Sequence, residues 1–189
     1  MKKSTAKKKT EAEMKALSLL AKDFGSAMQN FREFARVVEK DDDNIDRKVE
    51  IVTQTCADVM THLQVREDIF YPAVKEATGD ERLVNREISG NETVKQLIKR
   101  LTQLEPGDEL YDATFIVLGE TVAAHVKAEQ QILFPEARAA GLDDADLARK
   151  IQKREAELKA REGIEEQLPS LNVTGHHSDG VITKAGFQP

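Results

Sequence analysis

Two stretches of the sequence carry side chains that could hold a metal ion or exchange protons. The stretch "HLQVREDIFYP" begins at His62, and the similar stretch "HVKAEQQILFP" begins at His125. The second places Glu129 four residues after its histidine, whereas the first places Arg66 there. Residues four apart share one face of a helix, so His125 and Glu129 are expected to point at the same object.

Imidazole and carboxylate groups that converge inside a protein favour metal ligation. A buried polar group needs a partner, and one cation satisfies several such groups together. The alternative is a core histidine that bonds to a backbone carbonyl or to a neighbouring acid. The residue types alone leave both interpretations open for His62, His125 and Glu129.

Apolar residues recur with the helical period of 3.6 along most of the chain, and the sequence contains no Trp. The period predicts five helices, at about residues 11–40, 44–78, 81–104, 109–139 and 143–167. The second and fourth helices each carry the histidine and its partner four residues later on an apolar stripe. The inward stripes are also predicted to include Ile69, Ile88 and Ile132.

Four long helices joined by short turns pack antiparallel, so we predict an all-α, up-down-up-down four-helix bundle. The repeat then relates two helical hairpins to each other. The last helix is dense in Lys, Arg and Glu and is expected to lie outside the bundle. Residues 11–168 are predicted to form this domain, with disordered tails at 1–10, which is basic, and at 169–189.

Composition and charge narrow the classes of function. The net charge of −6 gives no general reason to expect nucleic-acid binding. No apolar run reaches the length of a membrane span. The single cysteine, Cys56, is compatible with a reducing compartment, so we expect a cytoplasmic protein. The sequence is compatible with binding to another protein. It indicates neither the identity of that partner nor the oligomeric state.

Over roughly residues 14–160 the sequence resembles the hemerythrin-like (HHE cation-binding) family. The shared phrases include "HLQVREDIFYPA", "NETVKQLIKRL" and "HVKAEQQILFPEARAAGLD". The resemblance implies a repeated His-x-x-x-Glu motif followed by Phe/Tyr-Pro, with one further histidine on the first helix and one on the third. It also implies an oxygen-bridged pair of irons that binds or senses oxygen, or takes part in nitric-oxide or redox chemistry.

The family's ligand pattern is incomplete in this sequence. Three positions match it: His62, His125 and Glu129. Phe24 stands at the first-helix histidine, Arg66 at the second bridging glutamate, and Asn91 at the third-helix histidine. A guanidinium is always charged and matches a carboxylate, so Arg66 is expected to point inward as a counter-ion to Glu129.

We therefore expect no intact di-iron centre, and either no cofactor or one iron or zinc ion. The first hypothesis is a non-catalytic structural, regulatory or binding protein rather than an enzyme. The alternative is a metal-binding protein that holds the ion through His62, His125 and Glu129 and binds or senses oxygen, nitric oxide or redox state.

Overall fold

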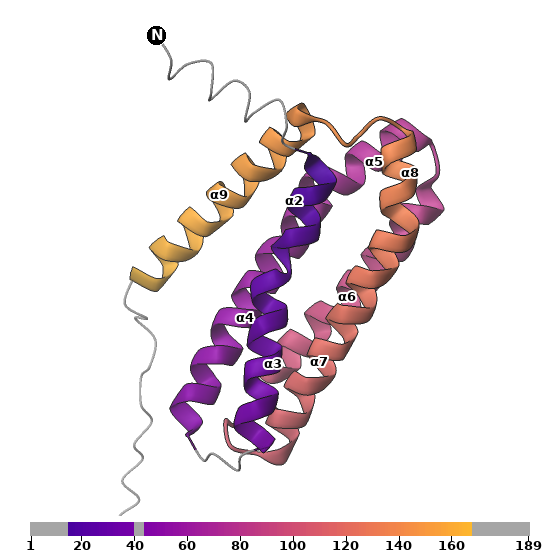
Figure 1. The fold of residues 1–189 in the computed structure, drawn as a ribbon. Coiled ribbons are helices and arrows are strands. Elements are labelled where there is room, and N and C mark those ends of the chain that lie inside the picture. The colour runs from indigo at the N-terminus through magenta and orange to yellow at the C-terminus, as the bar shows by residue number, and fades with distance from the viewer. Residues whose placement is uncertain (1–14, 40–43, 168–189) are drawn as a thin grey trace, which may run out of the picture.

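In the computed structural model four antiparallel rods of helix form the body of the protein, and one more helix crosses its side (Figure 1). The structure describes residues 15–39 and 44–167, and side chains as far as residue 161. In chain order the rods are α2 (Ala16–Asp23) with α3 (Gly25–Glu39); α4 (Ile45–Val65), η1 (Arg66–Phe70) and α5 (Tyr71–Thr78); α6 (Glu81–Leu101); and α7 (Glu109–Ala128), η2 (Glu129–Leu133) and α8 (Phe134–Ala139).

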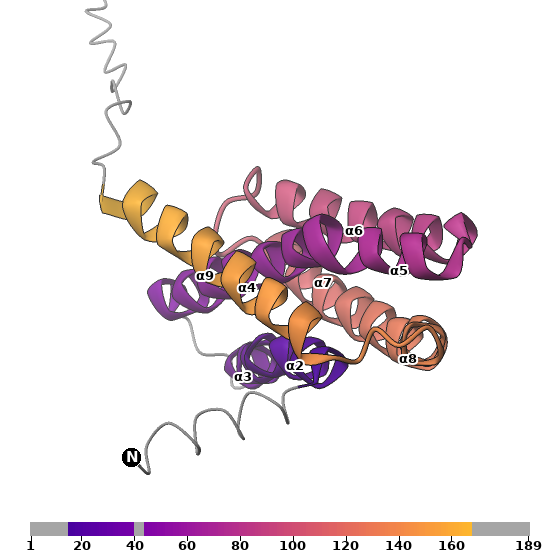
Figure 2. The ribbon, with the colours of Figure 1, turned by 90° about the horizontal axis from the view of Figure 1, so that it is seen from above.

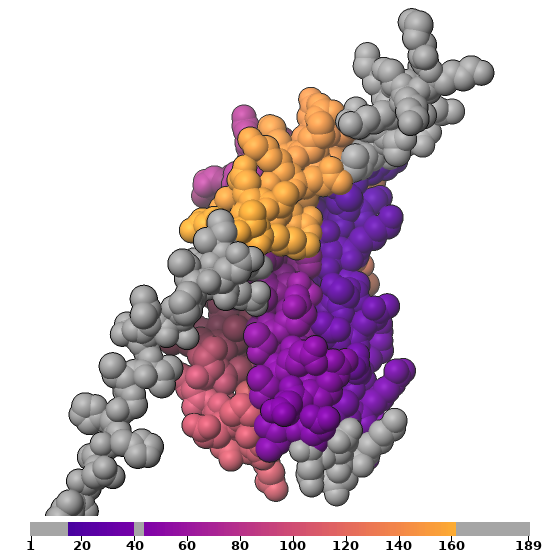
Figure 3. Space-filling view, turned by 90° about the vertical axis from the view of Figure 1, so that its left-hand side faces the viewer, coloured from indigo at the N-terminus to yellow at the C-terminus, as the bar shows by residue number. Residues whose placement is uncertain are grey.

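This arrangement confirms the predicted antiparallel four-helix bundle with an extra C-terminal helix. The extra helix, α9 (Ala145–Gln167), lies across α2 and α4, as the views from above and from the side show (Figures 2 and 3). It buries Leu147, Ala148 and Ile151 against the first hairpin. The predicted tails, 1–10 and 169–189, lie outside the described residues, as do 11–14 and 168.

The first rod is broken where the sequence predicts one uninterrupted helix. The N–H of Phe24 donates to the carbonyl of Lys22 instead of that of Leu20, four residues back, and α3 begins at Gly25. The carbonyl of Leu20 therefore lacks its usual helical donor. It becomes available to a side chain from another helix.

The second and fourth rods each contain one turn of π-helix, η1 and η2. These turns begin at the equivalent positions Arg66 and Glu129, and a proline, Pro72 or Pro135, is the second residue of the helix that follows. Proline has no N–H, and its ring crowds the carbonyl four residues earlier. A wider turn, with a bond spanning five residues, relieves that crowding. Each π-helical turn thus coincides with the proline of its repeat.

Each π-helical turn inserts an extra residue and shifts the inward stripe beyond it. Ile132 was predicted to face the core but is 39% exposed, and Leu133 is fully buried in its place. In the second rod Phe70 is likewise fully buried, while Ile69 is only half-buried. The prediction for Ile132 was therefore wrong because a strict 3.6-residue period does not hold through η2.

Two apolar clusters fill the bundle on either side of a polar layer. One includes Leu20, Phe70 and Leu133, and the other includes Phe24, Val59 and Phe115. The polar side chains of the two repeated stretches lie between them along each rod. Within the described residues, every helix is too short or too polar to span a lipid bilayer.

Candidate functional site

Arg66 lies at the centre of the polar layer with its side chain completely buried. Its Nε atom donates to both carboxylate oxygens of Glu129, each at 3.1 Å, and Glu129 is itself fully buried. The contact joins the equivalent first residues of η1 and η2. Arg66 thus occupies the inward position that the repeat predicts, and its charge faces that of Glu129.

The other two guanidinium nitrogens bond to backbone carbonyls. Nη2 donates to Leu20 at 2.8 Å, which is the carbonyl left free by the break between α2 and α3. Nη1 donates to the carbonyl of His62 at 3.3 Å. The ring of Phe24 lies 4.6 Å from the guanidinium carbon, close enough for a cation–π interaction. Contacts from three rods therefore fix Arg66 in one orientation.

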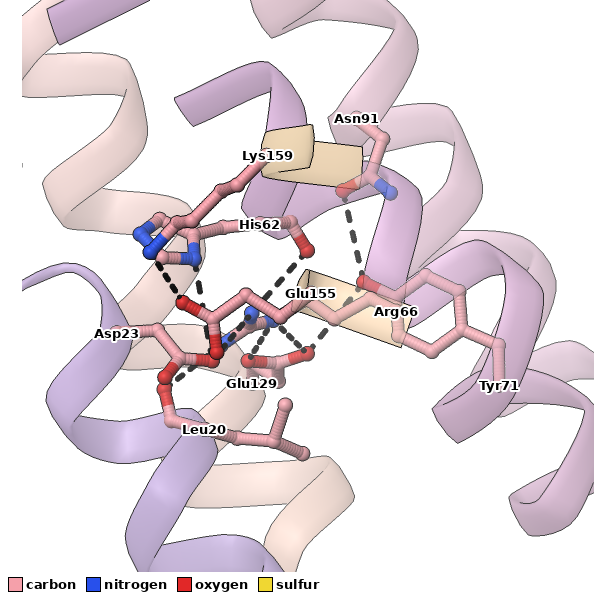
Figure 4. Close-up of polar contacts among 9 residues, drawn as sticks. All are labelled: Leu20, Asp23, His62, Arg66, Tyr71, Asn91, Glu129, Glu155 and Lys159. Atoms are coloured by element: carbon pink, nitrogen blue, oxygen red, sulfur yellow. Dashed lines mark hydrogen bonds and ion pairs between the residues drawn. The ribbon is translucent and has the colours of Figure 1, made fainter. Parts of the chain in front are cut away.

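Asn91 belongs to a second group of polar contacts beside Glu129 (Figure 4). The hydroxyl of Tyr71 lies 3.4 Å from Oε1 of Glu129 and 3.5 Å from Oδ1 of Asn91, so both contacts are long. The amide of Asn91 donates to Glu67 at 2.8 Å, and Lys95 donates to the other oxygen of Glu67 at 2.8 Å. Asn91 therefore joins the buried carboxylate of Glu129 to the partly buried ion pair of Glu67 and Lys95.

His62 lies on the α9 side of the polar layer, next to Asp23 and beneath Glu155 and Lys159 of α9 (Figure 4). Its Nδ1 is buried, lies 4.0 Å from Oδ2 of Asp23, and has no hydrogen-bond partner within the described part of the chain. The edge of its ring meets the ring of Phe24, with the centroids 5.3 Å apart. His62 is thus enclosed by apolar contacts and lies near two acids, Asp23 and Glu155.

His125 lies on the opposite side, against α6. Its Nδ1 is 3.6 Å from Oε2 of Glu87, a buried carboxylate that also accepts a hydrogen bond from Arg86 at 2.6 Å. A Cβ atom on Gly90 would lie 2.6 Å from that same Nδ1, so only glycine admits the imidazole here. The Nε2 of His125 is buried without a hydrogen-bond partner among the described residues.

Glu87 also corrects the predicted stripe of α6. The period favoured Ile88 as the inward residue, yet Ile88 is 38% exposed and Glu87 is only 2% exposed. The carboxylate is turned inward toward His125, a partner too far along the sequence for a local period to reveal. The buried carboxylate group has partners in this place, because Arg86 donates to it and the ring of His125 lies beside it.

Burial changes the protonation of several groups in this layer. It raises the pKa of Asp23 to about 6, against the opposing attraction of Arg66. Burial and then the charge of Arg66 lower the pKa of His62 to about 4. Burial also lowers the pKa of His125, although Glu129 and Glu87 act in the opposite direction. Both imidazoles are therefore neutral at pH 7, and Arg66 carries the positive charge of the site.

The raised pKa of Asp23 predicts a pH-dependent effect of replacing this residue with asparagine. Protonated Asp23 is favoured in the folded state, so its stabilising contribution is complete below the ordinary pKa of 3.8 and is lost as the pH rises through about 6. We compare the parent with Asp23→Asn by the difference in their free energies of unfolding, parent minus variant. This difference should be smaller at pH 7.5 than at pH 4, by up to about 3 kcal/mol. Urea titrations at the two pH values measure this difference.

His125 lies on the opposite side of the layer and titrates alike in the parent and in the variant, so its effect largely cancels from that difference, whereas His62 lies 4.0 Å from Asp23 and responds to the substitution. Asp146→Asn provides a control, because Asp146 is an exposed carboxylate on α9. A parent-minus-variant difference that is the same at both pH values would contradict the assignment.

Several members of the site were not predicted from the sequence. Tyr71 had a detectable signal: it takes the place of Phe134 in the repeated phrase, so its hydroxyl is an asymmetry of the repeat. Asp23 adjoins Phe24 in the stretch that resembles the family's Asp-His pair. The carbonyl of Leu20 and the charged pair Glu155–Lys159 had no signal, because they depend on a helix break and on the path of α9.

A four-helix bundle with a polar layer of histidine and carboxylate side chains defines a class of protein that builds its sites between facing helices. The family model of the hemerythrin HHE cation binding domain matches residues 22–137, more than half of the 189-residue chain. The chain belongs to this hemerythrin HHE cation-binding family. Comparisons with curated proteins and with solved structures give no match.

Proposed function

We propose that this chain is a non-catalytic member of its family, in which the guanidinium of Arg66 replaces the metal cations, and that it acts as a structural, regulatory or binding protein. The observation that carries the proposal is the contact of the buried Arg66 with both oxygens of Glu129. A carboxylate that would hold a metal ion is thereby neutralised within the chain.

The charge of Arg66 also opposes metal binding at Glu129. The carboxylates of Glu129 and Asp23 outweigh the effect of burial and raise the pKa of Arg66, so it stays protonated. Two unit charges about 4 Å apart repel by about 4 kcal/mol at an effective dielectric constant of about 20, and a divalent ion doubles this. A metal ion bound to Glu129 would have to displace the guanidinium first.

The remaining positions support the same proposal. Phe24 fills its place with an aromatic ring packed on Arg66 and His62. Asn91 is engaged by Tyr71 and Glu67. Among the residues that the structure describes, no three His, Cys, Asp or Glu side chains are grouped so that they could hold a metal ion. These residues do not fit a di-iron centre.

A single-metal protein is the second candidate, and the two imidazoles favour it. Nδ1 of His62 and Nε2 of His125 are buried without hydrogen-bond partners in the described residues, and buried ring nitrogens normally have one. By residue type they and Glu129 suit iron(II) or zinc, although the three do not converge on one point in the described structure. This candidate would bind or sense oxygen, nitric oxide or redox state, and it requires Arg66 to move.

Metal analysis separates the two candidates. The full chain, produced with iron supplementation and purified without chelators, should contain substoichiometric iron and zinc. Its thermal midpoint should not change when either metal or a chelator is added. One ion per chain, lost in His125→Ala, would support the second candidate. Two tightly bound irons per chain would overturn the proposal.

A further inference from the structure

The outward face of α7 is unusually apolar for a helix at the surface of a bundle. Six large apolar side chains are exposed among the described residues, and four of them belong to α7 and η2: Leu110, Ile116, Val117 and Ile132. Leu110 is 57% exposed and Val117 is 46% exposed. Exposed apolar side chains gathered on one helix mark a surface that a partner can cover.

No described helix covers this face of α7. α7 packs against α3 and α6, whereas α9 lies across α2 and α4 on the first hairpin (Figure 3). Beside the exposed face, between α3 and α7, runs an apolar groove of about 280 Å³ lined by Phe31, Phe115 and Gly119. The apolar surface therefore continues from the helix into the groove.

Six of the exposed residues of α7 form a stripe that has the same spacing in both directions. They are Glu109, Ala113, Ile116, Glu120, Ala123 and Lys127. The intervals alternate between four and three residues, as in the seam of a coiled coil. The small alanines allow close approach. An antiparallel copy centred at the level of residue 118 would pair Ala113 with Ala123.

The charges of the stripe suit the same antiparallel pairing. Glu109 at one end would face Lys127 of the second copy, and the contact would occur twice because a two-fold interface repeats every pair. Neither side chain has an ion-pair partner among the described residues of its own chain. Near the middle, Arg32 lines the groove together with Glu120 and offers a positive charge to the glutamates at the centre.

We propose that two copies of this chain associate through α7, antiparallel about a two-fold axis at the level of residue 118. Ile116, the two alanines of the stripe and the neighbouring groove supply the apolar area, and Ile116 meets Glu120 of the second copy near the axis. The Glu109–Lys127 contacts set the direction and register. The interface is separate from the buried Arg66–Glu129 pair. The proposed dimer is therefore independent of whether the polar layer holds a metal ion.

Sedimentation velocity of the full chain over a range of concentrations tests the association. The parent should sediment as a dimer that dissociates on dilution, and Ile116→Asp should sediment as a monomer. Lys150→Glu is the control, because Lys150 is an exposed lysine on α9 and its substitution changes the net charge as Lys127→Glu does. A parent that is monomeric throughout, or a dimer that Ile116→Asp leaves intact, would overturn the proposal.

Charge reversal tests the register. Lys127→Glu alone and Glu109→Lys alone should each raise the dissociation constant at least about tenfold, since each disturbs two symmetric contacts. The double variant restores opposite charges and should return to the affinity of the parent. Circular dichroism checks that every variant is folded. A double variant no tighter than the singles would show that these residues do not face each other.

Discussion

Replacing Arg66 with alanine is expected to lower the free energy of unfolding by about 3–5 kcal/mol, measured by urea denaturation at pH 7. The substitution leaves the carboxylate of Glu129 buried and unpaired, and an uncompensated charge in a low-dielectric core costs about this much. It also removes the donor to the carbonyl of Leu20 at the break between α2 and α3. A loss below about 1 kcal/mol would mean that the pair is solvated.

Two controls separate the stranded charge from the loss of a large side chain. Arg66→Met combined with Glu129→Leu replaces both charges by apolar volume and should recover most of the stability, because the cost lies mainly in the unpaired charge. Arg82→Ala removes an arginine whose side chain is 93% exposed and paired with Asp80. It should change the stability by less than about 1 kcal/mol.

The meeting of Arg66 and Glu129 could be expected from the sequence because the repeat contains the necessary geometry. Both residues lie four positions after a histidine and six before a proline. Two hairpins related by pseudo-symmetry bring such equivalent positions together. The fold class was predictable for a related reason, since four long periodic stretches separated by turn signals leave few other arrangements.

The π-helical turns and their consequences could not be obtained from the period itself. A periodicity argument assumes 3.6 residues per turn throughout, so it placed Ile132 inside and missed Leu133. The prolines at 72 and 135 were visible signals of a local change, but the kind of turn depends on how the backbone relaxes around each ring. Glu87 was missed because its partner, His125, belongs to another helix.

Arg66→Glu as a single change should destabilise the metal-free protein more than Arg66→Ala does. Two carboxylates would then share one buried cavity, and like charges in such a place cannot both ionise cheaply. The difference in free energy of unfolding between Arg66→Ala and Arg66→Glu should become smaller as the pH falls, because protonation of one carboxylate removes the repulsion. Urea titrations of both variants at pH 5 and pH 7.5 measure this, and an unchanged gap would contradict it.

Combining Arg66→Glu with Phe24→His and Asn91→His should convert this destabilised cavity into an iron site. The three positions surround the same space: Phe24 and Arg66 are in contact, and Tyr71 touches both Asn91 and Glu129. Together with His62, His125 and Glu129, the new side chains complete the ligand set that the family resemblance implies. Iron should therefore bind at about two per chain and raise the thermal midpoint of the triple variant, because a ligand of the folded state stabilises it.

The parent and the triple variant with Glu129→Gln are the matched controls for elemental analysis and thermal melting. The parent should take up no stoichiometric iron, since its guanidinium occupies the centre of the cavity. Glu129→Gln should weaken uptake, since it removes one carboxylate of the restored ligand set while retaining the helix and the size of the side chain. A triple variant that folds but binds no iron would show that Phe24, Arg66 and Asn91 are not what keeps the metal out.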